Sequence, residues 1–480
     1  MTRVHEADVV IIGSGPGGAT TAALLAEAGR DVLLVEEGHH WTLDSAPSYS
    51  LAEMDQKYRN GGLNTTFGKT NITYVEGRCV GGGSEVNAGL YHRPLSSTLQ
   101  AWRERFRIEN FAPEELWPHF EAVERDFSVS RFPSGPGPSS MTLREGAAKL
   151  GWKTAEIQRF WKYDSQEGAS AVPTGRRQSM SETMIPRALA AGARILSDTI
   201  VTRIHTQGAR AISAIGRKEW DGVKEPVELR FRQLFVCAGA VQSPLLLRRS
   251  GITRNVGDTL RLHPMVRIVA AFDREVNDPA WGVPVEQIEE FKPELTLGCS
   301  HSSIPHLALW MGGEGPVRRE RLKRYQSAGV YYVAAVGSGA GKIRDLPLLH
   351  EPVVRLPLTQ QDLDRLGEGL YRLGQALFAA GAKEVSNPVE GEPPITSASD
   401  LDRLRTGLPQ GRMSVSTIHL FSSLPMGEEW STCAVNSFGK LHGFDNVHVN
   451  DGSILPLSPG VNPQGTILAI ARRNAERFLG

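Results

Sequence analysis

The sequence predicts an α/β protein of two lobes, the first of them built on a parallel β-sheet. Near the N-terminus, an apolar run at residues 9–12 leads directly into a cluster of glycines and then into a segment rich in Ala and Leu. That order is typical of the strand, phosphate-binding turn and helix of a Rossmann-type domain. The chain has 480 residues, more than one ordinary core accommodates, so a second lobe is expected.

The first predicted elements form a βαβ unit. Residues 9–12 read as a buried parallel strand, because strands covered on both faces are apolar throughout. Residues 19–28 predict a helix that ends at Gly29, since glycine commonly follows a helix C-terminus. Residues 31–36 predict the second strand of the unit.

The glycine cluster at residues 13–18 predicts a dinucleotide cradle. Gly13 suits a tight turn, Gly15 lets the backbone approach a pyrophosphate, and Gly18 permits close helix-to-strand packing. Ser14 lies between the first two, and the helix that follows offers N–H groups and a positive dipole end to the phosphates. Glu36 ends the second strand, where its carboxylate suits the ribose hydroxyls of an adenosine. The cradle alone does not separate FAD from NAD.

Two later segments extend the predicted site. Residues 77–90 contain three consecutive glycines, whose bare backbone N–H groups suit a second contact with a pyrophosphate or an isoalloxazine edge. Residues 234–237 predict another buried strand, followed by a small-residue turn and a helix that begins near Ser243 and Pro244. The cofactor contacts expected from these segments are Arg78, Gly82, Ser84, Asn87, Gly89 and Ala238.

Composition excludes several classes of function. Lys plus Arg and Asp plus Glu both number 53, so a nucleic acid or an anionic membrane surface is not expected as a partner. No apolar run approaches the length of a membrane span, and no histidine pair has metal-binding helix spacing, so no metal is expected. The four cysteines are scattered and the first residues lead straight into a strand, which favours reduced thiols and a cytoplasmic protein.

The runs at residues 77–90 and 238–252 resemble the two signatures of the glucose-methanol-choline (GMC) oxidoreductase family, and the similarity extends from Val9 to Phe478. Within that family, the ending at residues 460–463 with Thr466 and Ile467 is most similar to the long-chain alcohol oxidase branch. The resemblance implies a Rossmann-type FAD-binding domain with a parallel sheet, joined to an α+β substrate-binding domain on an antiparallel sheet.

The resemblance also implies how the two domains share the chain. The FAD-binding domain is expected at residues 1–50, 75–100, 186–265 and 431–480, and the substrate-binding domain at 51–74, 101–185 and 266–430. A β-ribbon at 197–204 and 212–215 places Val201 against the adenine in the family. The last core strand, 447–451, ends in Asp451, which matches the family's contact to the ribityl-pyrophosphate region.

His419 and Asn462 are the expected catalytic pair. The stretch from His419 to Gly427 resembles the family's histidine motif, although Ser422 replaces a glycine that would permit close packing or an unusual backbone angle. His263 also matches the family, as a structural position. Asn462 and Pro463 have the residue types of a helix N-cap and first turn, and that helix start is expected to face the flavin.

The implied reaction is the oxidation of a primary or secondary alcohol. His419 accepts the hydroxyl proton, Asn462 orients the oxygen, and the α-carbon gives a hydride to flavin N5. Dioxygen or another acceptor then reoxidises the flavin. Some family members attach FAD through a histidine that matches Val86, and because valine forms no such bond, noncovalent FAD is expected.

Three alternatives stay open. A sugar or glycoside carbon-3 oxidase shares the catalytic pair, a hydroxynitrile lyase shares the fold, and a noncatalytic nucleotide-binding scaffold shares the cradle. Polar residues around the flavin would favour a sugar, whereas an apolar tunnel would favour a fatty, terpene or aromatic alcohol. The aromatic residues of the second lobe favour an apolar tunnel, although they could equally belong to the hydrophobic core. They are Phe160, Trp161, Trp281, Trp310, Tyr331, Tyr332 and Phe421.

Overall fold

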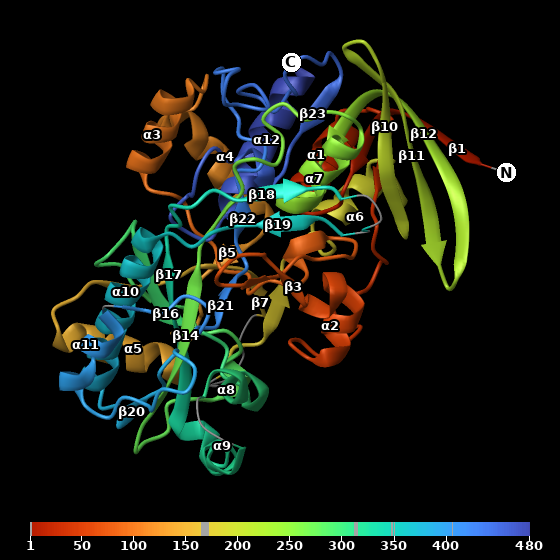
Figure 1. The fold of residues 1–480 in the computed structure, drawn as a ribbon. Helices are drawn as coiled ribbons and strands as arrows, with labels where there is room; N and C mark the ends of the chain where they lie inside the picture. Colours follow the sequence, from red (N-terminus) through yellow and green to blue (C-terminus); the bar gives the residue numbers. More distant parts are fainter. Residues whose placement is uncertain (1, 165–171, 312–314, 347–348, 350, 406) are drawn as a thin grey trace.

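The computed structural model describes residues 2–164, 172–311, 315–346, 349, 351–405 and 407–480. Two β-sheets dominate it, each flanked by helices, and the chain passes repeatedly from one to the other (Figure 1). Parts of the predicted substrate-binding domain, including residues 165–171 and 312–314, lie outside the described residues. The mixed α/β architecture with one parallel and one antiparallel sheet is the predicted fold class.

The first sheet is parallel at its centre. Its strands pair in the order β23-β12-β1-β2-β9, which are β23 (Val447–Val449), β12 (Val223–Val236), β1 (Arg3–Ile12), β2 (Val32–Val35) and β9 (Arg194–Leu196). Three helices pack together beside this sheet: α1 (Pro16–Glu27), α6 (Met184–Ala190) and α12 (Gln464–Leu479). Because parallel strands end at one edge, the segments after β1, β12 and β23 meet there.

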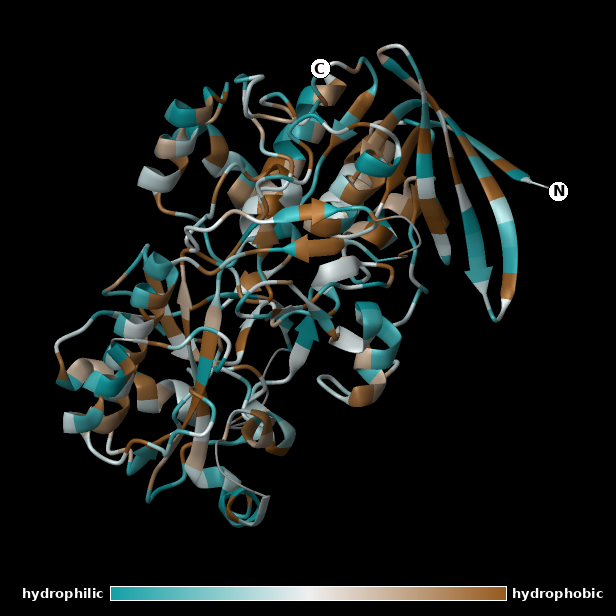
Figure 2. Ribbon diagram, in the orientation of Figure 1, coloured by the Kyte–Doolittle hydropathy of each residue, from teal (hydrophilic) through white to brown (hydrophobic). Residues whose placement is uncertain are grey.

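Strand β1 is longer than its apolar run predicts. Its continuous buried run is Val9 to Ile12, with Ala7 also buried, while pairing with β12 begins at Arg3. The predicted ribbon is confirmed as β10 (Thr199–Gln207) and β11 (Arg210–Trp220), which continue antiparallel onto β12. Figure 2 shows alternating hydrophobic and hydrophilic residues along these outer strands, the pattern of a sheet with one solvated face.

Two helices begin earlier than predicted. The first, α1, begins at Pro16 rather than residue 19, because proline suits the first helical position after Gly15. The helix α7 (Gly239–Arg249) begins before Ser243, so the prediction that it begins near Ser243 and Pro244 is wrong. Pro244 lies inside this helix and has no N–H to offer the carbonyl of Ala240. That carbonyl instead accepts a hydrogen bond from the Ser423 hydroxyl at 2.5 Å.

The second sheet is antiparallel over most of its width, as predicted. Its central strands are β14 (Met265–Ala271), β17 (Ala328–Ala335) and β16 (Leu295–Cys299). The helices α10 (Gln360–Ala379) and α5 (Pro138–Lys149) cover one face. Side chains alternate along β14, so Val266 and Ile268 enter the core under α10 while Met265 and Arg267 point to the opposite face. That opposite face is turned toward the first lobe.

Shorter elements complete the two lobes. Around the second sheet lie β3 (Asn64–Thr65), β4 (Ile72–Tyr74), β6 (Thr154–Glu156), β15 (Glu286–Ile288), β20 (Glu384–Val385), β21 (Val415–Thr417), α8 (Ile304–Trp310), α9 (Gly315–Leu322) and α11 (Asp402–Arg405). The other elements are α2 (Leu51–Lys57), α3 (Ser96–Phe106), α4 (Pro113–Asp126), β5 (Val129–Ser130), β7 (Arg159–Tyr163), β8 (Gly175–Arg177), β13 (Arg261–Leu262), β18 (Lys342–Arg344), β19 (Val353–Arg355) and β22 (Leu420–Phe421).

All four cysteines are buried and free, which agrees with the prediction of reduced thiols. Among the described residues, no helix combines the length and the apolar character that crossing a lipid bilayer requires. The predicted domain boundaries stay a prediction, although the two sheets do draw their strands alternately from the chain.

Candidate active site

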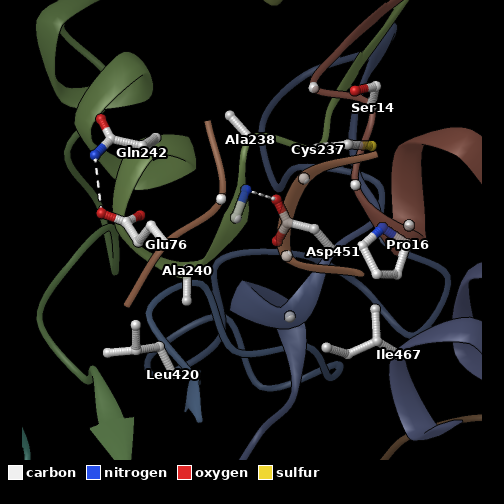
Figure 3. Close-up of a pocket in the computed structure, with 18 of the residues that line it drawn as sticks. Ser14, Pro16, Glu76, Cys237, Ala238, Ala240, Gln242, Leu420, Asp451 and Ile467 are labelled. Carbon is white, nitrogen blue, oxygen red and sulfur yellow. Dashed lines mark hydrogen bonds between the residues drawn. The ribbon is translucent and has the colours of Figure 1, made fainter. Parts of the chain in front are cut away.

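A cavity extends along the edge where β1, β12 and β23 end, and Figure 3 shows part of its wall. Most of the predicted cofactor residues line it. Those that do are Gly13, Ser14, Gly15, Glu36, Gly82, Asn87, Gly89, Val201, Ala238, Asp451 and Pro463. The predicted catalytic residues His419 and Asn462 line the same cavity. Segments far apart in the sequence thus meet at one edge of the sheet, as the Rossmann prediction requires.

Glycines form a bare backbone cradle in this wall. A Cβ atom placed on Gly15, Gly83 or Gly239 would meet nothing within 4 Å, although each residue lines the cavity. Gly13 has φ +100°, and a Cβ there would lie 2.3 Å from the carbonyl oxygen of Cys237. Since the N-terminus of α1 also faces this space, the cradle suits the pyrophosphate of a dinucleotide such as FAD.

Three predicted cofactor residues lie outside the cavity lining and support it from behind. A Cβ on Gly18 would lie 1.9 Å from the Gly13 carbonyl oxygen, so this glycine allows α1 to pack on the turn. The Ser84 hydroxyl donates to the Gly81 carbonyl at 2.8 Å and accepts from the Met180 N–H at 3.0 Å. Arg78 is half-exposed and pairs with Glu37 at 2.9 Å.

Glu36 and Asp451, the two acidic residues predicted to contact the cofactor, accept hydrogen bonds from other residues of the protein. Glu36 accepts from the backbone N–H and hydroxyl of Ser14 at 2.9 and 2.7 Å, and from the Gly38 N–H at 2.9 Å. Asp451 accepts from the Gly239 N–H at 2.8 Å and the Ser243 hydroxyl at 2.5 Å, which fixes the start of α7 to the end of β23. Burial raises the pKa of both carboxyls, and these hydrogen bonds act against that shift.

Sequence reasoning missed a polar group on the same wall. Glu76 is 3.3 Å from the amide of Gln242 (Figure 3) and 3.8 Å from the guanidinium of Arg59. All three residues line the cavity. Burial raises the pKa of Glu76 to about 7. The sequence could have indicated Glu76 as a site residue, because it lies directly before the glycine segment at residues 77–90. Nothing in the sequence around Arg59 indicates a site residue in the same way.

His419 and Asn462 are in contact. Asn462 Nδ2 lies 3.1 Å from His419 Nε2, and on the other side of the ring His419 Nδ1 lies 2.9 Å from His263 Nδ1. His263 Nε2 is in turn 2.5 Å from the Ser458 hydroxyl. All three hydrogen bonds that link these four side chains are satisfied when both imidazoles are neutral. His419 Nδ1 then donates to His263 Nδ1, and His263 Nε2 donates to the Ser458 hydroxyl. His419 Nε2 is then unprotonated.

His263 therefore belongs to the site, beyond the structural role that sequence reasoning gave it. Burial lowers the pKa of His263 well below its usual value. Burial, with a smaller contribution from the Arg267 guanidinium, lowers the pKa of His419 to about 4. Both rings are consequently neutral at neutral pH, which is the state that a proton acceptor needs.

Asn462 does not act as a helix cap, so that part of its prediction is wrong. The helix α12 begins at Gln464 with Pro463 in the cap position, and no side chain caps it. The amide of Asn462 instead faces His419. One face of α12 packs into the first lobe, with Leu468, Ala471 and Ala475 buried and Phe478 partly buried.

A second cavity adjoins the first at the catalytic pair. His419 and Asn462 line both, and the second continues over the face of the antiparallel sheet that α10 leaves open. Of the aromatic residues considered for a substrate tunnel, Tyr332 lines this cavity, while Phe160, Tyr331 and Phe421 are fully buried core residues. Arg267 lies on the floor of the cavity. A single arginine within the apolar strand at residues 265–271 was the signal that could have found it.

Comparison with known proteins gives the family. The family model for GMC oxidoreductase matches in its N-terminal part at residues 54–265 and in its C-terminal part at residues 344–471. A model for the NAD(P)-binding Rossmann-like domain matches residues 11–62. The chain belongs to the GMC oxidoreductase family, which is FAD-dependent, and is an enzyme of that family.

Relatives and solved structures agree with this assignment. An uncharacterized GMC-type oxidoreductase of Sinorhizobium fredii is 39% identical over 99% of this chain and 95% of its own length. A long-chain-alcohol oxidase of Arabidopsis thaliana is 26% identical over 97% of this chain and 67% of its own. Pyridoxine 4-oxidase from Mesorhizobium loti has the same fold, with a TM-score of 0.75 and 21% identity over 98% of this chain and 99% of its own.

Proposed function

We propose that this enzyme oxidises an alcohol to the corresponding carbonyl compound with noncovalent FAD, and that His419 is the base. The observation that carries the proposal is the contact between His419 Nε2 and Asn462 Nδ2 at the junction of two cavities. One cavity has the glycine cradle that suits a dinucleotide, and the other leaves room for a substrate. The catalytic pair lies where the two ligands would meet.

The residues of the site have distinct tasks in this reaction. FAD, when bound, supplies the acceptor for the hydride that leaves the α-carbon. His419 Nε2 takes the hydroxyl proton, so that the alcohol loses one hydride and one proton and becomes a carbonyl. Asn462 donates to the substrate oxygen and keeps it facing His419. His263 holds the imidazole of His419 through Nδ1, which keeps Nε2 unprotonated. Nε2 accepts the proton of the substrate once the amide of Asn462, which donates to Nε2 in the structure, turns to the substrate oxygen.

The cofactor pocket supports noncovalent binding. Val86 has no nucleophile, and its carbonyl accepts a hydrogen bond from the Tyr58 hydroxyl at 3.2 Å. Acid precipitation is therefore expected to release free FAD from a yellow protein. Flavin that remains with the precipitate would contradict this part of the proposal.

The four buried thiols also favour a cytoplasmic location.

An anaerobic alcohol panel followed by flavin absorbance tests the proposed function. Bleaching of the flavin by an alcohol, with formation of the carbonyl compound, is the expected result. A flavoprotein that performs no net oxidation, such as a lyase of this fold, would convert its substrate without bleaching. Adding dioxygen and then a dye to the reduced enzyme would show which electron acceptor it uses.

A further inference from the structure

Arg267 is a cation on the floor of the cavity that adjoins His419. It lies on β14, where alternation of the strand points it away from the core under α10. One end of its guanidinium, Nη1, donates to the Ser416 hydroxyl at 2.5 Å. Its Cζ atom lies 5.3 Å from the centre of the Trp310 ring, within the range of a cation–π interaction.

The guanidinium of Arg267 has no carboxylate partner among the residues that the structure describes. Some buried arginines pair with a carboxylate, as Arg59 does with Glu37 at 2.6 Å. Arg473 has no carboxylate but donates to several backbone carbonyls, whereas the only acceptor of Arg267 among the described residues is the Ser416 hydroxyl. Burial lowers the pKa of Arg267 to about 10, so it stays charged at neutral pH. A partly buried charge with neither a counter-ion nor several hydrogen-bond acceptors is costly, and a bound ligand of opposite charge would offset that cost.

We propose that the alcohol oxidised at His419 carries a carboxylate, and that Arg267 binds that carboxylate. This inference rests on the proposed function and names the substrate class. Nη1 is engaged by Ser416, which leaves Nε and Nη2 without an acceptor within the described part of the chain. These two N–H groups form the planar edge that receives the two oxygens of a carboxylate.

The residues that line the rest of the cavity suit an apolar carbon skeleton. They include Met265, Val283, Pro293, Val336 and Val461, with polar side chains at Thr296, Ser300 and Tyr332. A neutral alcohol would leave Arg267 unpaired beneath it. One guanidinium also balances one carboxylate, whereas a phosphate monoester carries about −1.5 to −2 charges at neutral pH and would need further cations.

The carboxylate would also assist the chemistry at His419. Arg267 disfavours a positive charge on the His419 ring, since it contributes to the lowered pKa of that imidazole. A carboxylate bound to Arg267 reduces this opposing field. His419 would then accept the substrate proton more readily when a hydroxy acid is bound than when a neutral alcohol is bound. Arg267 thus links recognition of the acid group to activation of the base.

Matched substrate pairs test the inference on the wild-type holoenzyme. Suitable pairs are 4-(hydroxymethyl)benzoate with 4-(hydroxymethyl)benzamide, and hydroxyalkanoates of four to eight carbons with their amides. Anaerobic flavin reduction gives the apparent second-order rate constant for each compound. Because a charged hydrogen-bonding pair is lost in the amide, the best acid should exceed its amide by roughly 10- to 100-fold. A ratio within threefold for every pair would overturn the inference, as would a sulfonate or phosphate analogue that outperforms the carboxylate.

Variants assign the preference to Arg267. Arg267→Met removes the charge and keeps an unbranched stem, and the ratio of acid to amide should fall to about one. Arg267→Lys keeps the charge but loses the planar edge, so an intermediate ratio is expected. Arg274→Met is the control, because Arg274 follows the same strand but pairs with Glu145 outside the cavity. A preference for the acid that survives in Arg267→Met would contradict the assignment.

A binding titration separates failure of this inference from failure of the proposed function. The probes are 4-methylbenzoate and 4-methylbenzamide, which have no hydroxyl group and are followed through perturbation of the flavin spectrum. Tighter binding of the benzoate, lost in Arg267→Met, supports the arginine site even if no alcohol bleaches the flavin. Bleaching by neutral alcohols and hydroxy acids alike, with no preference for the benzoate, would leave the proposed function standing and refute the carboxylate.

Discussion

At the scale of single residues, Ser422 has a backbone conformation that glycine adopts more easily. Its φ is +66°, and its buried hydroxyl has no hydrogen-bond partner in the structure. Sequence reasoning identified this position as one where the family's glycine permits close packing or an unusual angle, and of these two the structure shows the unusual angle. The departure from glycine therefore affects the local backbone beside His419, and the contacts of His419 itself are intact.

Ser422→Gly is accordingly expected to stabilise the protein by about 1 kcal/mol. The change removes a left-handed conformation that costs a non-glycine residue roughly 1–2 kcal/mol, together with an unsatisfied hydroxyl. Greater flexibility of the unfolded chain offsets part of the gain. A thermal melt at constant FAD concentration measures the effect. Ser423→Ala serves as the control and should lower the melting temperature, because its hydroxyl bonds to Ala240.

The pH dependence of flavin reduction follows from the environment of His419. Below its pKa of about 4 the ring is protonated and cannot accept the substrate proton, so the rate should rise with pH through that value and then stay level. The titratable groups that interact with the ring include His263, His92 and Arg267, and removal of the Arg267 charge should move the midpoint upward. Stopped-flow reduction across the pH range measures both midpoints. A wild-type midpoint near 7 would mean that His419 is not held neutral by burial.

At the scale of structural elements, Glu36 connects β2 to the turn before α1. Glu36→Ala should weaken FAD binding by about 1.5–3 kcal/mol, because it removes a charged acceptor beside the predicted ribose position and releases Ser14. Titration of apoprotein with FAD measures this change. If the affinity is unaltered, the ribose contact is elsewhere, and Glu37→Ala becomes the variant to examine.

The start of α12 gives a second prediction at this scale. Asn462→Ala should slow flavin reduction, although less than loss of the base, because the amide orients the substrate oxygen. Its melting temperature should stay close to that of the wild type, since Asn462 caps no helix N–H. A loss of about 1 kcal/mol in stability, typical of a removed N-cap, would show that the side chain does support the helix start.

At the scale of the whole molecule, the sequence predicted most of the fold and part of the site. The first lobe could be predicted because its strand, its glycines and its acidic residue follow one another in a fixed order. The antiparallel sheet of the second lobe was predicted from the family resemblance. The start of α7 was missed because Ser243 has the residue type of a cap but bonds to Asp451. Arg267 and His263 were missed as site residues because their partners, Ser416 and His419, are about 150 residues away in the chain.

The measurement that tests the central claim most directly is anaerobic flavin reduction in His419→Ala. The variant should bind FAD normally but reduce it roughly 10²- to 10⁴-fold more slowly than the wild type, the usual contribution of a general base. His119→Ala provides the control, because His119 pairs with Glu476 away from both cavities. If His419→Ala is reduced at the wild-type rate with the wild-type pH profile, His419 is a packed core histidine and the proposed mechanism is wrong.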